Sequence, residues 1–269
     1  MNFTKQFICK PGSKVKLTER AAGLTPGFKD RDAAEKILAR NVERLATLGY
    51  RLYAENQRSL LIVLQAMDAG GKDGTVRHVM TGLDPQSCRV TSFKAPTSED
   101  LAHDFLWRIH QAAPRRGEVG IFNRSHYEDV LIARIHNLVP KSVWKDRYEQ
   151  INQFEQLLAA NGTTVLKFFL HISKDEQRER LESRLHDPEK NWKMNPADLK
   201  ERERWDDYRA AYEIALSRCN TPAAPWFIIP ANKKWYRNLV VSSVIVETLE
   251  RMAPRYPKPP ASLAKLTVR

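Results

Sequence analysis

The sequence predicts an α/β fold in which a five-stranded parallel sheet lies between two layers of helices. Short apolar runs alternate with longer amphipathic segments along most of the chain, a pattern typical of a doubly wound parallel sheet. The first apolar run, residues 60–64, is followed by a glycine loop that ends in a lysine and then by a helical pattern. Strand, loop and helix in this order form a phosphate-binding loop, so the expected fold is a P-loop kinase-like three-layer sandwich with a helical lid.

The remaining elements follow in order from their periodicity. Residues 1–30 mix basic residues with Pro-Gly turns and are expected to form an extended arm on the surface, ahead of a single domain over 31–269. Apolar residues at spacings of three and four predict a helix over 32–55. Strands are expected at 60–65, 89–93, 118–122, 163–172 and 226–229, because these runs are short and apolar or β-branched. Further helices are expected over 72–80, 101–111, 123–137, 143–160, 173–186, 196–217 and 238–252.

Three residues mark helix ends. Ser98 is the expected N-cap of the helix at 101–111, and Gly162 ends the helix at 143–160. Ser173 and the glutamate three residues later predict a capping box for the helix at 173–186. In a parallel sheet with right-handed crossovers, the loops after the strands meet at one edge, so we expect the loops after the first, third and fourth strands to converge.

Composition narrows the class of protein. The 269 residues carry a net charge of +12, which indicates an anionic substrate or partner and does not separate nucleic acid from other polyanions. No run approaches the roughly 20 apolar residues of a membrane span, and the first residues lack the apolar core of a signal peptide. The three cysteines are widely spaced and predict reduced thiols in a cytoplasmic protein.

The loop after the first strand is the main candidate site. Its glycines allow backbone N–H groups to converge on one anion, and Lys72 adds a full positive charge. The loop departs from the strict pattern, because Ala66 replaces the first glycine, Asp73 the hydroxyl residue, and Thr75 comes two residues late. A glycine turn with a surface lysine is the alternative. We predict that phosphate is bound by Ala69, Gly70, Gly71, Gly74 and Thr75 together with Lys72.

Residues 65–75 have the sequence Gln-Ala-Met-Asp-Ala-Gly-Gly-Lys-Asp-Gly-Thr. This stretch resembles the P-loop of polyphosphate kinase family 2, whose members carry an aspartate directly after the lysine. Two later stretches are also similar to that family: residues 122–130, Phe-Asn-Arg-Ser-His-Tyr-Glu-Asp-Val, and the run from 187–193 to 205–208. The resemblance covers roughly residues 30–251, and the second stretch looks like the class III subgroup.

The resemblance implies roles for several residues. Asp68, Lys72, Asp73 and Arg124 are the expected catalytic residues, and Asp68 and Asp73 would hold Mg²⁺, for which carboxylates and phosphate oxygens are suitable ligands. Asp73 at a helix start is also explained by the helix dipole alone. Arg124 is the expected phosphate clamp, since a guanidinium binds two oxygens at once.

Two residues beside Arg124 are expected to affect the choice of acceptor. Asn123 stands where many family members have aspartate, so a direct metal contact is in doubt there. Glu128 stands where many diphosphate-specific relatives have an amide. Both are expected in the nucleotide phosphate site, and together they predict activity on both AMP and ADP.

A lid is expected at about residues 175–208. Arg180 and Arg184 lie four apart and share a helix face, and with their basic neighbours they would form a flap over the strand ends. A solvated charged helix with internal ion pairs is the alternative. The predicted lid ligands are Arg178, Arg180, Arg184 and Lys193.

Together these features predict a polyphosphate-dependent nucleotide phosphotransferase that transfers the terminal phosphate of inorganic polyphosphate reversibly to nucleoside mono- and diphosphates. Mg²⁺ is the expected cofactor, with no nucleic acid or membrane partner, and a homo-oligomer, dimer or tetramer, is expected. An ATP-dependent kinase of a nucleotide or small metabolite would share the loop and the lid. A non-enzymatic nucleic-acid binder would instead place its basic residues on a helix or sheet surface.

Overall fold

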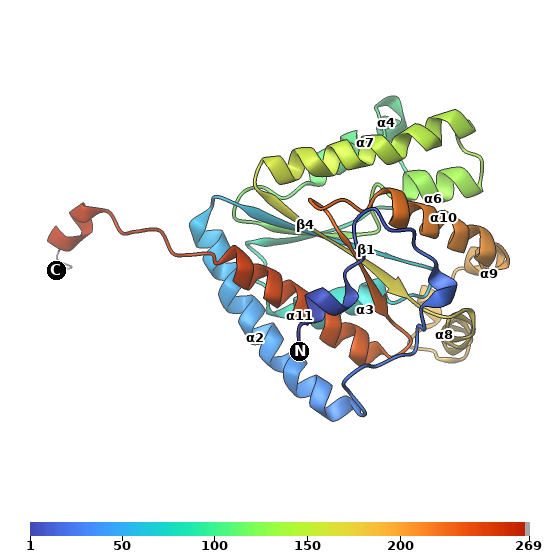
Figure 1. The fold of residues 1–269 in the computed structure, drawn as a ribbon, viewed down its shortest axis with the longest axis horizontal. Coiled ribbons are helices and arrows are strands. Elements are labelled where there is room, and N and C mark those ends of the chain that lie inside the picture. The colour runs from blue at the N-terminus through green and yellow to red at the C-terminus, as the bar shows by residue number, and fades with distance from the viewer. Residues whose placement is uncertain (267–269) are drawn as a thin grey trace.

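The computed structural model describes residues 1–266, and its centre is a parallel sheet of five strands (Figure 1). The strands are β1 (Ser59–Ala66), β2 (Cys88–Ser92), β3 (Val119–Asn123), β4 (Thr163–His171) and β5 (Trp226–Pro230), in the order β2-β3-β1-β4-β5. All four pairings are parallel, and Leu64 of β1 is in register with Asn123 and Phe168. The carboxyl ends of the strands therefore meet at one edge, as predicted.

Helices cover both faces of the sheet, which confirms the expected α/β class (Figure 1). One face carries α2 (Arg31–Glu55), α3 (Lys72–Val79) and α11 (Lys234–Met252). The other carries α6 (Glu128–Ile135), α7 (Lys141–Ala160) and α10 (Trp205–Arg218). Strand β1 is buried at every position from Ser59 to Ala66, because it pairs on both sides and has a helical layer on each face.

The remaining helices are short or lie at the edge that carries the loops. They are α1 (Phe3–Phe7), α4 (Ser98–Ala102), α5 (Trp107–Ala112), α8 (Lys174–His186) and α9 (Pro196–Glu203), with 3₁₀ turns at Leu17–Glu19, Met80–Gly82, Asn191–Lys193 and Ala261–Lys265. The predicted lid region corresponds to α8, the turn after it, α9 and the start of α10. Among the described helices, none has the length and apolar character that a membrane span requires.

Several helices differ from the sequence prediction, and α6 begins at Glu128 and not at 123. The helix expected at 101–111 is two short helices, and the N-cap is Thr97, one residue before Ser98, in a capping box with Asp100. The helix expected at 196–217 breaks at Arg204 into α9 and α10. Helix α11 begins four residues earlier than expected. The capping box at Ser173 is half formed, because its hydroxyl accepts from the Glu176 backbone N–H while the Glu176 carboxylate pairs with Arg180.

The N-terminal residues, which were expected to form a surface arm, are anchored to the core. Phe3 and Phe7 are buried in the core, and Phe7 packs edge-on against Tyr236. The backbone N–H of Cys9 donates to the carbonyl of Trp226 on β5 at 2.8 Å. The basic and Pro-Gly residues suggested a solvated segment, but Phe3 and Phe7 are large apolar side chains that are buried against the core. We therefore propose that residues 1–30 fold as part of the same domain as the rest.

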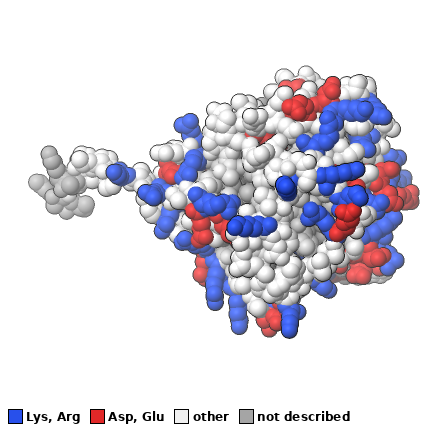
Figure 2. Space-filling view, viewed as in Figure 1, with Lys and Arg blue, Asp and Glu red and all other residues white. Residues whose placement is uncertain are grey.

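Charged side chains surround this core unevenly. Figure 2 shows a largely uncharged centre on this face, with Lys and Arg mixed with acidic residues over α2 and on the side of α8 and α9. The basic residues are therefore not confined to the loops after the strands.

Candidate active site

The loop between β1 and α3 has the backbone shape that a phosphate-binding loop needs. Ala69 and Gly71 both adopt the left-handed conformation, with φ of 57° and 100°. A side chain at Gly70 would place its Cβ 2.4 Å from the Cβ of Ala66, so only glycine fits there. Thr75 is fully buried, and its hydroxyl donates to the carbonyl of Gly71 at 3.1 Å. Its side chain thus bonds within the first turn of α3 in this structure.

Lys72 reaches back along this loop. Its ammonium group donates to the carbonyl of Ala66 at 3.1 Å, which places the charge at the carboxyl end of β1. Burial lowers the pKa of Lys72, and the positive charge of Arg124 lowers it further, while Asp68, Glu128 and Asp73 raise it. The charge is therefore held in a partly desolvated position, where its attraction for a phosphate oxygen is stronger than in water.

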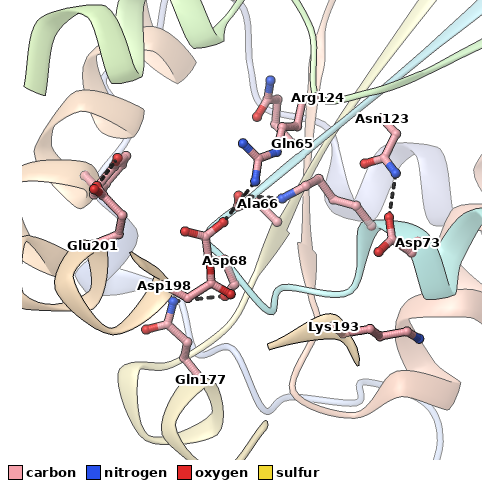
Figure 3. Close-up of polar contacts among 12 residues, drawn as sticks. Gln65, Ala66, Asp68, Asp73, Asn123, Arg124, Gln177, Lys193, Asp198 and Glu201 are labelled. Carbon is pink, nitrogen blue, oxygen red and sulfur yellow. Dashed lines mark hydrogen bonds and ion pairs between the residues drawn. The ribbon is translucent and has the colours of Figure 1, made fainter. Parts of the chain in front are cut away.

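Arg124 extends from the turn between β3 and α6. Its backbone is left-handed, with φ of 63°, and its N–H donates to the carbonyl of Leu64 at 3.1 Å. The guanidinium Nη2 lies 3.3 Å from the Asp68 carboxylate (Figure 3). The pKa of Arg124 is raised, because the carboxylates of Glu128 and Asp68 outweigh its burial. The structure thus places this predicted clamp beside the P-loop, with further guanidinium donors available to a phosphate.

Asp73 and Asn123 form a second pair on the other side of Lys72. The amide nitrogen of Asn123 donates to the Asp73 carboxylate at 2.6 Å (Figure 3). Within residues 1–266, three or more potential metal-ligating side chains do not come together. Mg²⁺ is commonly bound by one or two carboxylates with substrate phosphates completing its shell. One oxygen of Asp68 and one of Asp73 make no hydrogen bond within the described residues, so this donor set fits an ion held jointly with phosphate oxygens.

A cavity of about 420 Å³ opens from the Lys72 side of the loop, between α6, α9 and α10. This size is within the range of small-molecule sites. Its lining combines the phosphate-binding candidates with aromatic and carboxylate side chains from the three helices: Ala66, Met67, Asp68, Lys72, Arg124, Glu128, Ile132, His136, Leu138, Asn195, Ala197, Asp198, Glu201, Trp205, Tyr208 and Tyr212. Another hollow, of about 370 Å³, lies along α5 and contains none of the predicted site residues.

Two carboxylates at this cavity resist ionisation. Burial raises the pKa of Glu128, although Arg124 and Lys72 oppose the shift. Burial also raises the pKa of Asp198, and the charge of Asp68 adds to the effect. Burial therefore disfavours the ionised form of both carboxyl groups, and a cation bound beside them would favour it.

The far end of the cavity is a hydrogen-bonded group around the Glu201 carboxylate, whose pKa is lowered because the hydrogen bonds from Tyr208 and His136 outweigh its burial. Its Oε2 accepts from the Tyr208 hydroxyl at 2.6 Å and lies 3.0 Å from His136 Nε2. Glu201 Oε1 makes no hydrogen bond within the described residues and can accept from a ligand. These contacts also join α9 and α10 to the end of α6.

The predicted lid arginines differ in their surroundings. Arg180 is 9% exposed, and its guanidinium donates to the carbonyls of Ala69, Ala231 and Asn232 at 2.9, 2.6 and 3.1 Å. Arg180 is therefore not an exposed flap residue in this structure, because α8 packs against the P-loop and buries it, and its role as a ligand stays a prediction. Arg184 lies 3.3 Å from Asp198 and so ties α8 to α9.

The other two predicted lid ligands lie further out. Arg178 is exposed and lies 3.9 Å from Glu182, the arrangement of a solvated helix face. Lys193 lies over the ring of Trp192 at 4.8 Å, and in Figure 3 its ammonium group points away from Asp198. Neither contacts the P-loop in this structure, and their role as ligands stays a prediction.

Several residues of the site were not found from the sequence. Gln177 donates to the carbonyl of Asp68 at 2.9 Å, and Tyr212 donates to the carbonyl of Ala66 at 3.0 Å, so both brace the loop. Arg237 of α11 lies against Gly71. The spacing of Tyr208 and Tyr212 was a signal in the sequence, because residues four apart share a helix face. The sequence contains no such signal for Arg237, which precedes the predicted start of its helix.

The arrangement is suited to the transfer of a phosphoryl group. Backbone N–H groups, Lys72 and Arg124 can neutralise phosphate oxygens, and a cavity of nucleotide size opens beside them.

Comparison with known proteins agrees with this geometry. The family model described as polyphosphate kinase 2 matches residues 28–257. A relative from Meiothermus ruber, named AMP/ADP-polyphosphate phosphotransferase, is 52% identical over 98% of this chain and 99% of its own length. One from Rhodopseudomonas palustris, named ADP-polyphosphate phosphotransferase, is 47% identical over 95% of this chain and 92% of its own. The crystal structure of polyphosphate kinase 2 from Arthrobacter aurescens superposes with a TM-score of 0.94 at 42% identity, covering 98% of this chain and 95% of that one. The chain therefore belongs to the polyphosphate kinase 2 family.

Proposed function

We propose that this protein transfers the terminal phosphate of inorganic polyphosphate to nucleoside mono- and diphosphates. The observation that carries the proposal is the P-loop whose lysine and neighbouring arginine form one end of a nucleotide-sized cavity. The names of the Meiothermus ruber and Rhodopseudomonas palustris relatives support polyphosphate as the donor and favour it over ATP. The reaction is reversible in principle, since the bond broken and the bond formed are both phosphoanhydrides.

The chemistry requires positioning and charge neutralisation. The P-loop N–H groups and Lys72 hold the terminal phosphate of the donor, and Arg124 binds oxygens of the acceptor and donor phosphates. An oxygen of the acceptor phosphate attacks the terminal phosphorus, the anhydride bond to the donor chain breaks, and its electron pair stays on the shortened polyphosphate. Asp68 holds Arg124 in place through the 3.3 Å contact.

Asp68 and Asp73 would hold Mg²⁺ through their remaining oxygens. When bound, the ion would neutralise charge on the phosphate oxygens. Asn123 would act on the same site through Asp73, because its amide already occupies one oxygen of that carboxylate at 2.6 Å.

Acceptance of both AMP and ADP is part of the proposal. An acceptor with one phosphate leaves space that a second phosphate would fill. Glu128, whose carboxylate is buried beside Arg124 and Lys72, can hold water or an ion in that space. At the far end of the cavity, Glu201 offers an acceptor to the hydroxyl or amino groups of the nucleoside.

A donor exchange tests the function. The protein is incubated with Mg²⁺ and with AMP or ADP as the acceptor. The phosphate donor is either long-chain polyphosphate or a nucleoside triphosphate, and the nucleotides are then separated. Polyphosphate is expected to give ADP and ATP from AMP, and ATP from ADP. Product formed from the triphosphate and none from polyphosphate would contradict the proposal and favour an ordinary nucleotide kinase.

The oligomeric state and the location of the protein belong to the same proposal. We infer a dimer or tetramer, which light scattering of the purified protein measures. We also infer a cytoplasmic location, which the free thiols of Cys9, Cys88 and Cys219 support.

A further inference from the structure

Arg237 is a buried cation pressed against the P-loop. It lies in the first turn of α11 and is 2% exposed. A Cβ at Gly71 would lie 1.9 Å from its Nη1, and a Cβ at Gly74 would lie 3.2 Å from its Nη2. The guanidinium is thus in contact with the backbone of the loop and of the first turn of α3, at two positions that carry glycine.

The partners of this guanidinium are few and neutral. Its Nε and Nη2 donate to one amide oxygen, that of Asn238, at 3.1 and 2.8 Å. Within residues 1–266, its Nη1 makes no hydrogen bond and no carboxylate lies within ion-pair distance of it. Lys167 shows the opposite case, a fully buried cation that lies 2.6 Å from Glu155 and also contacts Tyr127 and Cys219. Buried charges are ordinarily paired, so Arg237 is an exception that requires a reason.

The surroundings of Arg237 are positive. Burial and the charge of Arg180 lower the pKa of Arg237 to about 9, so it remains protonated at neutral pH. Arg237 and Arg180 also lower the pKa of Lys234, after burial. The N-terminus of α3, with its partial positive charge, faces the same place. Three cations, of which Arg180 is paired with Glu176, and a helix N-terminus are therefore gathered where an anion would be stabilised.

We propose that Arg237 is a phosphate ligand, whose Nη1 binds an oxygen of the phosphoryl group held in the P-loop. It would act from the face of the sheet that carries α11 (Figure 1), whereas Arg124 belongs to the turn between β3 and α6. The inference deepens the proposed function and rests on it for the identity of the donor. It also explains Gly71, because any side chain there would displace the guanidinium from the loop.

Thermal unfolding with and without an anion tests this assignment. The variants are R237M, which removes the charge but keeps the length, and R237K, which keeps the charge without the planar fork. K167M is the control, since it removes a buried cation that has a carboxylate partner. The unfolding temperature of each protein is measured without an anion, with tripolyphosphate and with ATP. Mg²⁺ and the nucleotide acceptor are left out of every sample.

R237M is expected to unfold at or above the wild-type temperature when no anion is present, because it removes an unpaired buried charge. K167M is expected to unfold earlier, because Glu155 loses its partner. The stabilisation by tripolyphosphate seen in the wild type should be lost in R237M. R237K should bind tripolyphosphate at least ~10-fold more weakly than the wild type, since it cannot reproduce the fork.

Stabilisation of R237M by tripolyphosphate to the wild-type extent would overturn the proposal. If R237M is too unstable to measure, wild-type affinity in R237K would overturn it instead. If ATP stabilises the wild type and tripolyphosphate does not, polyphosphate is refuted as the donor. The stabilisation of R237M by ATP, compared with that of the wild type, then decides the role of Arg237. If neither anion stabilises the wild type, the phosphate site at the loop is refuted together with that role.

Discussion

Replacing Arg180 with alanine should destabilise the fold as well as slow the reaction. From the sequence, Arg180 and Arg184 were expected to act together in a lid over the strand ends. In the structure, the guanidinium of Arg180 joins three segments, because it donates to the carbonyls of Ala69 in the P-loop and of Ala231 and Asn232 after β5.

The size of the effect follows from these contacts. A hydrogen bond from a charged group to a buried partner contributes about 1.5–3 kcal/mol. Water can replace some of the lost donors, and removal of Arg180 relieves its repulsion of Arg237. We therefore expect a net loss of roughly 2–3 kcal/mol, which is a fall of roughly 5–10 °C in the unfolding temperature for a chain of this size. Arg184 has one ion pair, with Asp198, and its loss should cost about 1 kcal/mol or less.

The measurement is calorimetric unfolding of R180A and R184A beside initial rates with polyphosphate and ADP. R180A should lose both stability and turnover, because Ala69 is no longer held. R184A should lose turnover with a small change in unfolding temperature, since it connects α8 and α9 beside the cavity. An R180A protein that unfolds at the wild-type temperature would refute the structural role and restore the lid interpretation.

Three further outcomes are expected. K72A should keep its fold and lose at least ~100-fold in turnover, since the lost contact acts on the transferring phosphate, and near-normal rates would exclude the P-loop assignment. N123D places a carboxylate against Asp73, so the variant should unfold at a lower temperature than the wild type without Mg²⁺. Mg²⁺ should restore the unfolding temperature, and the ratio of the AMP rate to the ADP rate should change. An unfolding temperature of N123D that does not depend on Mg²⁺ would contradict this. Burial raises the pKa of Glu128, so ionisation of its carboxyl group destabilises the folded state. This cost in folding free energy is absent at pH values below the pKa in the unfolded state and is complete at pH values above the pKa in the folded state. E128Q should therefore gain stability over the wild type as pH rises through that interval, and a pH-independent difference would show that the carboxyl is not perturbed.

The chain order of strands, the loop and the helices could be predicted because these features are local. The apolar run at 60–65, the glycines after it and the amphipathic pattern of 32–55 each report burial within a few residues. Convergence of Asp68 and Arg124 was also predictable, since parallel strands and right-handed crossovers bring the loops after β1 and β3 to one edge.

The breaks in helices could not be predicted in this way. The stretch around Arg204 is charged on both sides, so its apolar periodicity does not mark where α9 ends and α10 begins. The break matters, because it turns α9 toward the cavity and brings Glu201 within 3.0 Å of His136.

Which charges are paired was decided by the tertiary structure alone. Arg180 appeared in the sequence as one of several arginines on a charged helix, yet it is buried against carbonyls from two distant loops. Arg237 has no local signal, and its contact with Gly71 exists because α11 packs beside α3 on one face of the sheet. Local patterns determine which segments form strands and helices, whereas the partner of a long side chain depends on the packing of segments that lie far apart in the sequence.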